Sequence, residues 1–155
     1  MTKPLAVITG ASSGIGEATA KAFSNAGYPT LLLARRIEIM ESFNLKNSIC
    51  KKIDVRDRDA LVSAIREAEK QYGPTDMMFN NAGVARLADI STQDPSEWDE
   101  MIDVNTKGVM NGIYAVMKDM KARQSGTIVN MSSIAGRKVY GDHTVYCGTK
   151  YFVHA

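Results

Sequence analysis

Residues 5–16 read LAVITGASSGIG, an apolar run that passes directly into a glycine-rich turn. The run from Leu5 to Thr9 does not alternate between polar and apolar residues, which is typical of a strand buried on both faces. The residues that follow the turn, IGEATAKAFSNA at 15–26, are rich in helix formers and stop before Gly27, a residue type that commonly ends helices. A buried strand, a glycine turn and a helix in this order favour a parallel sheet with helices packed against it.

The same alternation of strands and helices continues along the chain. Further buried strands are predicted over residues 29–34, 47–54, 76–83 and 126–133, and helices over residues 35–47, 56–72, 95–123 and from about 145 onward. The sequence contains no internal repeat, low-complexity tract or linker. It therefore predicts a single doubly wound α/β domain over residues 1–155, with a parallel sheet in the strand order 3-2-1-4-5.

The composition of the 155 residues limits the classes of protein and partner. Apolar residues make up 45% and charged residues 23%, which is ordinary for a soluble globular domain. A net charge of +2 without a run of basic residues argues against nucleic acid and anionic membranes as partners. Cys50 and Cys147 form neither a disulfide framework nor a metal cluster, and His143 and His154 lack ligand spacing. No apolar stretch approaches the ~20 residues of a membrane span, so we expect a cytoplasmic protein without a metal site.

The turn from Thr9 to Gly16 has the composition of a phosphate-binding loop. Its glycines allow a tight turn and close approach to a ligand, and the next helix presents free N–H groups to a pyrophosphate. The spacing is neither Gly-x-Gly-x-x-Gly nor that of a Walker loop, and a glycine-rich turn without a ligand is the alternative. The strand before the turn and the helix after it favour dinucleotide binding. The expected contacts are Gly10, Ser12, Ser13, Gly14, Ile15 and Gly16.

Two arginines follow the second predicted strand, where an acidic residue would bind the adenosine ribose of NAD. An acid at this position would repel the 2′-phosphate of NADP, whereas a guanidinium binds it with charge-assisted hydrogen bonds. We therefore predict NADP(H) as the cofactor, with Arg35 as the main contact and Arg36 as the second. The alternative is a pair of solvated arginines in a loop.

Tyr146 and Lys150 in VYCGTK lie one helical turn apart, so their side chains share one face of the predicted last helix. A lysine ammonium close to a phenol favours its ionised form, which a free phenol reaches only near pH ~10. Such a tyrosine can exchange a proton with a substrate oxygen near neutral pH. On its own, the pattern Tyr-x-x-x-Lys more often marks a solvated helix face.

These and other motifs together resemble the short-chain dehydrogenase/reductase family, in its compact single-domain branch. The resemblance runs from Leu5 to Lys150 and implies a Rossmann-type fold. The motifs follow the family's order and spacing: Thr-Gly-x-x-x-Gly-x-Gly at 9–16, Asn-Asn-Ala-Gly at 80–83, a helical asparagine at 105, a serine at 133, and Tyr-x-x-x-Lys at 146–150.

The resemblance implies further contacts with the cofactor. Asp54 and Val55, which end the third predicted strand, would hold the adenine. Beyond the fourth strand, Asn81, Ala82 and Gly83 would line the cofactor near its ribose.

The resemblance also implies a catalytic set. Ser133, rather than its neighbour Ser132, would donate a hydrogen bond to the substrate oxygen, because its spacing to Tyr146 matches the family. Tyr146 would be the general acid in reduction and the general base in oxidation. Lys150 would favour the ionised tyrosine and bind the nicotinamide ribose, and Asn105 would hold a water that links Lys150 to solvent.

The function expected from these residues is hydride transfer between NADP(H) and a secondary alcohol or its ketone, a small-molecule substrate. One alternative is a catalytically silent nucleotide-binding or regulatory protein on the same fold. Another is a mononucleotide-binding domain, which would need Lys or Thr after the glycines, where Glu17 stands. Arg86, Arg137 and His143 lie in loops expected to border the substrate, where they either meet a substrate carboxylate or are solvated.

Parts of the family pattern have no counterpart in these 155 residues. They are the rest of the helix that contains Tyr146, two further strands, and the loop that closes over the substrate. We therefore expect a longer natural chain, and poor stability and no activity for this stretch alone. In the resemblance, this helix and the one over residues 98–123 pack in a homodimer or homotetramer.

Overall fold

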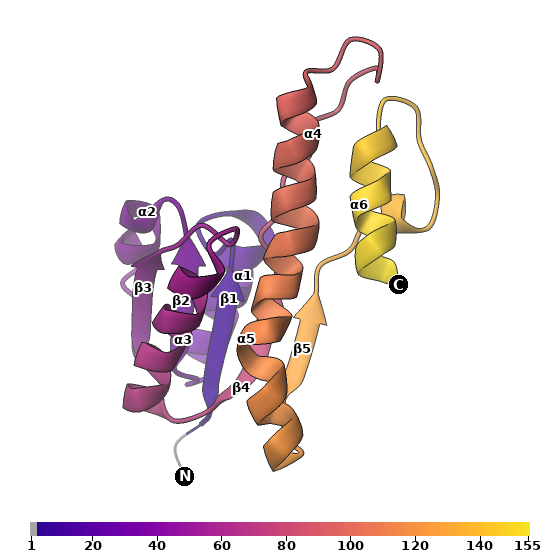
Figure 1. Cartoon of the computed structure of the whole chain (residues 1–155). Helices are drawn as coiled ribbons and strands as arrows, with labels where there is room; N and C mark the ends of the chain where they lie inside the picture. The colour runs from indigo at the N-terminus through magenta and orange to yellow at the C-terminus, as the bar shows by residue number, and fades with distance from the viewer. Residues whose placement is uncertain (1–2) are drawn as a thin grey trace.

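The computed structural model describes residues 3–155 and contains a parallel five-stranded sheet in the order β3-β2-β1-β4-β5 (Figure 1). The predicted doubly wound Rossmann-type fold and its strand order are therefore confirmed. The central strands β1 and β2 are buried along their whole length, as their continuous apolar sequences predict. The strands are β1 (Leu5–Thr9), β2 (Thr30–Ala34), β3 (Ser48–Lys52), β4 (Thr75–Asn80) and β5 (Thr127–Asn130).

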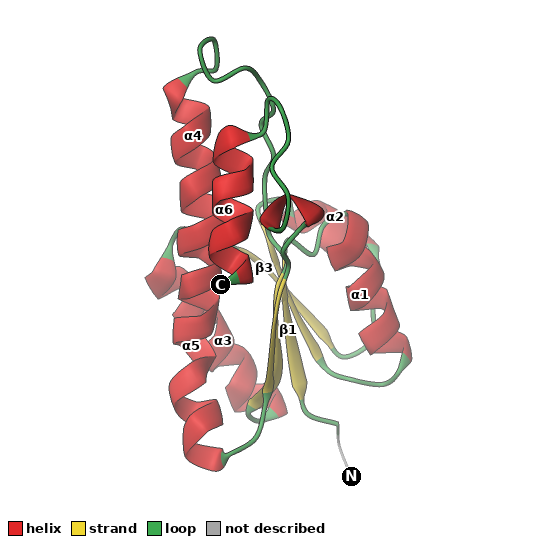
Figure 2. Cartoon of the chain, turned by 90° about the vertical axis from the view of Figure 1, so that its right-hand side faces the viewer, coloured by secondary structure: helices red, strands yellow, loops and turns green. Residues whose placement is uncertain are grey.

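Helices lie on both faces of the sheet, with α1 and α2 on one side and α3, α4 and α5 on the other (Figure 2). Helix α6 lies beside α4, beyond the β5 edge (Figure 1). The α-helices are α1 (Gly14–Asn25), α2 (Ile37–Ser42), α3 (Arg58–Tyr72), α4 (Pro95–Ile102), α5 (Gly108–Arg123) and α6 (Thr144–His154).

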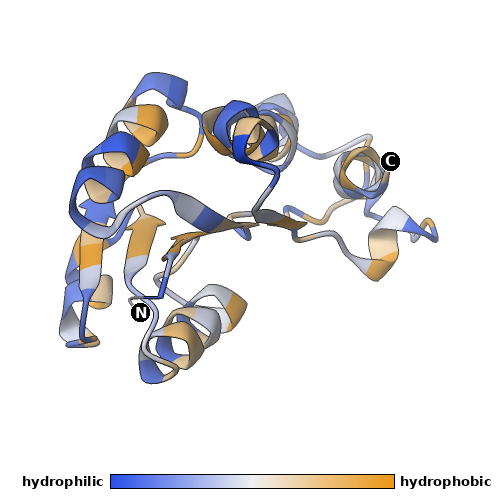
Figure 3. Cartoon of the chain, turned by 90° about the horizontal axis from the view of Figure 1, so that it is seen from below, coloured by the Kyte–Doolittle hydropathy of each residue, from blue (hydrophilic) through white to orange (hydrophobic). Residues whose placement is uncertain are grey.

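Two apolar cores form because successive residues of a strand point to opposite faces of the sheet. Val7 of β1 packs with Leu61 and Ile65 of α3 in one core, whereas the next residue, Ile8, packs with Ala20 of α1 in the other. Figure 3 shows the sheet between the helices of its two faces, with hydrophobic ribbon concentrated where the layers meet.

The helix predicted over residues 95–123 is interrupted by a π-helical turn, η1 (Asp103–Lys107). Gly108 ends this turn, and its N–H donates to the carbonyl of Asp103. Asn105 lies inside the turn and is fully buried. Such single π-turns are frequent at functional sites, and this one directs Asn105 toward the last helix.

Exposed apolar residues lie on α5 and on β5. Of the methionines at helical spacing in α4 and α5, Met101 and Met120 are buried. Met110 and Met117 are 50% and 45% exposed, so they are not core residues of this chain. Strand β5 forms an exposed edge of the sheet, with Val129 43% exposed. No helix within residues 3–155 is long and apolar enough to cross a bilayer.

Candidate active site

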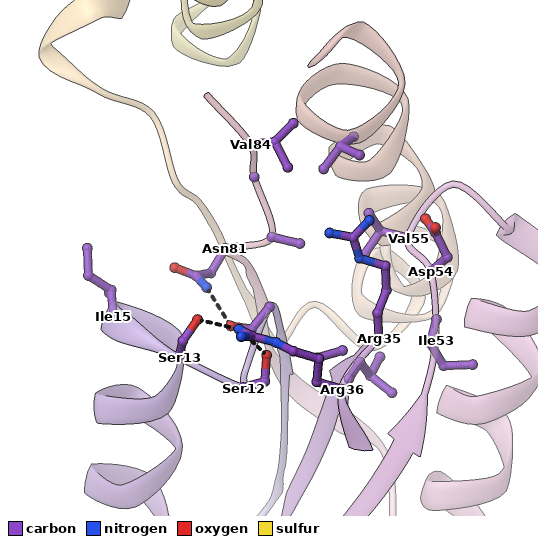
Figure 4. Close-up of a pocket in the computed structure, with 16 residues that line it drawn as sticks. Ser12, Ser13, Ile15, Arg35, Arg36, Ile53, Asp54, Val55, Asn81 and Val84 are labelled. Carbon is purple, nitrogen blue, oxygen red and sulfur yellow. Dashed lines mark hydrogen bonds between the residues drawn. The ribbon is translucent and has the colours of Figure 1, made fainter. Parts of the chain in front are cut away.

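A cleft with a volume of about 310 Å³ opens at the carboxyl ends of β1, β2 and β4 (Figure 4). The residues predicted to contact a dinucleotide line it, except Gly14, Gly16 and the two catalytic-helix residues described below. Its lining consists of Gly10, Ser12, Ser13, Ile15, Leu33, Ala34, Arg35, Arg36, Ile53, Asp54, Val55, Asn81, Ala82, Gly83, Val84 and Val104.

The glycines of the turn have separate physical roles. Gly10 has a φ of +63°, and a Cβ there would lie 2.8 Å from the Cα of Ala82, so only glycine fits. A Cβ on Gly16 would lie 2.3 Å from the carbonyl oxygen of Gly10. Gly16 therefore allows α1 to pack against the turn, and Gly14 adopts a φ of +57° at the start of α1. Neither Gly14 nor Gly16 lines the cleft; both shape the turn that does.

Thr9 and Asn81 fasten the ends of β1 and β4 to each other. The Oγ1 of Thr9 accepts from the backbone N–H groups of Asn81 (3.0 Å) and Ala82 (3.1 Å). In return, the amide of Asn81 donates to the Thr9 carbonyl at 3.0 Å. Thr9 is part of the glycine motif but not one of the predicted contacts, although its position at the end of a buried strand is the signal for such a role.

Arg35 and Arg36 diverge at the entrance of the cleft, as Figure 4 shows. Arg36 donates from Nη2 to the hydroxyls of Ser12 (3.2 Å) and Ser13 (3.0 Å), which places a guanidinium against the glycine turn. Arg35 points toward the side of the cleft that Val55 lines, and its Nη1 lies 3.7 Å from a carboxylate oxygen of Glu100.

The loop after β3 is fixed by two contacts. The Arg56 guanidinium bonds Asp54 at 2.6 Å and holds the pKa of that carboxyl below its usual value. Asn111 of α5, which is 3% exposed, donates to the carbonyl of Val55 at 2.8 Å and accepts from Nε of Arg58 at 2.9 Å. Asn111 is absent from the predicted site, because no local pattern in the sequence connects it with the loop.

We expect Asn111→Ala to lower the free energy of unfolding by about 2 kcal/mol, because it leaves the buried Val55 carbonyl without its partner and frees Arg58. Urea unfolding followed by circular dichroism measures this loss. Lys118→Ala on the exposed face of the same helix is the control and should change stability by less than about 0.5 kcal/mol. Equal stability of the two variants would mean that the Asn111 bonds contribute nothing.

Lys150 of α6 lies next to the cleft, although it is not one of the residues that line it. The residue is 4% exposed, and burial lowers the pKa of its ammonium group. Its Nζ donates to the carbonyl of Met131 at 2.8 Å and lies 5.8 Å from the ring centroid of Tyr146. A Cβ on Gly83, a lining residue, would be 3.7 Å from this Nζ. The structure therefore brings the Lys150 ammonium close to the cleft at Gly83, with Tyr146 beside it on α6.

Asn105 is held from two sides. Its Nδ2 donates to the carbonyl of Val84 (2.8 Å) and to the hydroxyl of Thr149 (3.1 Å), while its Oδ1 accepts from the N–H of Val84 (2.8 Å). Both amide hydrogens are thus used, and one lone pair on Oδ1 is left to accept from a water. These bonds join the loop after β4 to α6.

The two serines after β5 differ in their bonds. Ser132 donates its hydroxyl to the backbone carbonyl of Lys150 at 3.1 Å. The Ser133 oxygen accepts from the N–H of Ala135 at 3.1 Å and caps the short 3₁₀ turn η2 (Ile134–Gly136). Among the residues that the structure describes, the hydroxyl hydrogen of Ser133 has no hydrogen-bond acceptor. Its expected role toward the substrate oxygen stays a prediction.

The residues expected near a substrate are arranged around Tyr146 and α4. His143 precedes α6, with its ring centroid 6.4 Å from that of Tyr146. Arg86 donates from Nε to Glu100 at 3.0 Å, so its charge is paired, whereas Arg137 is exposed. Of the basic residues that were candidates for a substrate carboxylate, Arg86 is already engaged. Within the described part of the chain, no cluster of three or more His, Cys, Asp or Glu is placed to hold a metal ion.

The fold and the glycine turn define a protein of the Rossmann type, with a glycine-rich turn after its first strand that lines a cleft. A profile described as short chain dehydrogenase matches residues 4–155. The chain belongs to the short-chain dehydrogenase/reductase family.

Individual relatives agree with the family. An uncharacterized oxidoreductase of Staphylococcus saprophyticus is 43% identical over 153 residues, which cover 96% of this chain and 62% of the relative. The structure of serine dehydrogenase from Escherichia coli is 31% identical with a TM-score of 0.91, over 96% of this chain and 71% of that one. A closed form of serine dehydrogenase in complex with NADP+ is 31% identical with a TM-score of 0.92, over 96% and 62% of the two chains. The chain thus spans less than two thirds of the length of two of these three relatives.

Proposed function

We propose that the protein is an NADP(H)-dependent oxidoreductase that interconverts a secondary alcohol and its ketone. The observation that supports this most strongly is that the Nζ of Lys150, which is 5.8 Å from the Tyr146 ring, lies close to Gly83 in the lining of a cleft that also contains two arginines. The cleft also has the features that a dinucleotide needs, namely a glycine turn with no room for a Cβ and a helix N-terminus behind it. When bound, the nicotinamide supplies or accepts the hydride.

The protein's own residues position the substrate and transfer the proton. Ser133 donates its free hydroxyl hydrogen to the substrate oxygen and stabilises the negative charge that develops there. Tyr146 gives its proton to that oxygen in reduction and removes it in oxidation. The Lys150 ammonium stabilises the tyrosinate. Asn105 accepts a hydrogen bond from a water with its remaining lone pair, and this water passes the replacement proton from solvent toward Lys150 and Tyr146.

We expect the protein to bind NADPH at least about tenfold more tightly than NADH, because a charge-assisted bond from Arg35 to the 2′-phosphate contributes about 1.5 kcal/mol or more. Titration of the protein in its full natural length with each cofactor, followed by nicotinamide fluorescence, measures both affinities. Arg35→Ala should remove most of the preference and leave NADH binding unchanged.

Lys46→Ala is the matched control, because it removes one exposed positive charge from another loop. It should change neither affinity. Tighter binding of NADH than of NADPH by the wild type would contradict the cofactor assignment, while the family would stand.

A further inference from the structure

We propose that Glu100 is a specificity-determining residue that weakens NADP(H) binding by holding Arg35, and that Arg86 limits this effect by holding Glu100. The three side chains form a charge cluster, Arg35–Glu100–Arg86. Glu100 and Arg86 are absent from the residues predicted from the sequence to bind the cofactor. This inference rests on the proposed function, in which Arg35 binds the 2′-phosphate.

The geometry gives each oxygen of Glu100 a different partner. Oε1 lies 3.7 Å from Nη1 of Arg35, and Oε2 lies 3.0 Å from Nε of Arg86. The Glu100 side chain is 22% exposed, whereas those of Arg35 and Arg86 are 59% and 46% exposed. The carboxylate is therefore the most buried member of the cluster, and it lies on α4 between two more exposed guanidinium groups.

The two contacts also differ in kind. Arg86 donates a hydrogen bond to Glu100, but the Arg35 contact is too long for one and is purely Coulombic. An exposed Coulombic contact of this sort is weak, so a phosphate that offers charge-assisted hydrogen bonds can take Arg35 from it.

Other charged groups leave Glu100 as the carboxylate that is available to Arg35. Asp54 also faces Arg35 from the loop after β3, as Figure 4 shows, but it is bonded by the guanidinium of Arg56 through both of its oxygens. Its negative charge is therefore largely compensated. Among residues 3–155, Arg86 is the one guanidinium that is hydrogen-bonded to Glu100.

The charges determine the sign of each effect. A bound 2′-phosphate competes with Glu100 for Arg35 and is itself repelled by the Glu100 carboxylate, so removal of that negative charge favours NADP(H). Removal of the positive charge of Arg86 leaves Glu100 less compensated and disfavours NADP(H). NADH has no 2′-phosphate and is expected to respond to neither change.

The test is a titration of the full-length natural protein with NADPH and with NADH for Glu100→Gln, Arg86→Gln and the double variant. We expect Glu100→Gln to tighten NADPH binding by about three- to fivefold, the range of an exposed ion pair, and to leave NADH unchanged. Arg86→Gln should weaken NADPH binding by a similar factor, and it should have no such effect when Glu100 is already Gln.

Asp99→Asn is the control, because it removes the same charge from the neighbouring exposed residue of α4. It should change the ratio of the two affinities less than Glu100→Gln does. Two results would overturn this inference: unchanged or weaker NADPH binding by Glu100→Gln, or an equal effect of Arg86→Gln with Glu100 and with Gln at position 100. If the wild type still prefers NADPH through Arg35, the proposed cofactor assignment would stand. A wild type without that preference would overturn the proposed cofactor assignment and this inference with it.

Discussion

A Tyr146→Phe variant of the full-length protein is expected to bind NADPH like the wild type and to reduce ketones at least about a hundredfold more slowly. The change removes only the hydroxyl group, so the packing of α6 and the 5.8 Å distance from Lys150 to the ring are preserved. What disappears is the proton that neutralises the substrate oxygen as hydride arrives. Steady-state oxidation of NADPH, followed by its absorbance with a panel of ketones, measures kcat, and cofactor titration measures binding.

Tyr151→Phe is the matched control, because Tyr151 lies on the same helix and is 41% exposed. It should keep wild-type turnover. Equal turnover by Tyr146→Phe and the wild type would contradict the role of Tyr146 as the acid. A wild type that binds NADPH but turns over none of the ketones would favour the alternative of a catalytically silent nucleotide-binding protein.

Gly112→Ala is expected to lower the free energy of unfolding by about 3 kcal/mol or more, the range of severe overpacking in a core. A Cβ at this position of α5 would lie 1.8 Å from Oδ1 of Asn80 and 2.7 Å from Cε of Met78. Both side chains are buried in β4, and Asn80 also donates to Asn130 of β5 at 2.8 Å. Relief of the clash requires α5 to move away from the sheet or the Asn80–Asn130 bond to break.

Gly148→Ala is the control for this prediction, since a Cβ there meets nothing within 4 Å. It should leave stability unchanged or raise it by up to about 1 kcal/mol, because alanine is a better helix former than glycine. Urea unfolding at one protein concentration measures both variants. A stability loss for Gly112→Ala no larger than the change for Gly148→Ala would show that helix and strand are less closely packed here than described.

The sequence was sufficient to predict those features that depend on short stretches of chain. The buried strands β1 and β2 were predictable because they have almost no polar side chains, and a strand of that kind is stable only between neighbours on both sides. The glycine turn was predictable because Gly10 adopts a backbone conformation that other residues rarely accept. Both follow from local chemistry.

Features that depend on contacts between distant residues were not predictable in this way. Asn111 donates a hydrogen bond to Val55, which is 56 positions away in the sequence, and no sequence pattern near either residue predicts the contact. In the sequence, Glu100 looks like an ordinary charged residue on the polar face of an amphipathic helix. Only the fold shows that it lies between two arginines. The π-turn around Asn105 was also missed, because its residues have ordinary helical spacing and the extra residue per turn is stabilised by bonds to Val84 and Thr149.

The two bonds from the stretch after β5 to Lys150 have a consequence for tolerance to insertions. Met131 accepts from the side chain of Lys150, and Ser132 donates to its backbone carbonyl. A Cβ on Gly136 would also lie 2.5 Å from that carbonyl, so the 3₁₀ turn lies directly against α6. One residue inserted between 131 and 136 would displace both bonds and the close contact together. The number of residues in this stretch therefore determines the position of Lys150.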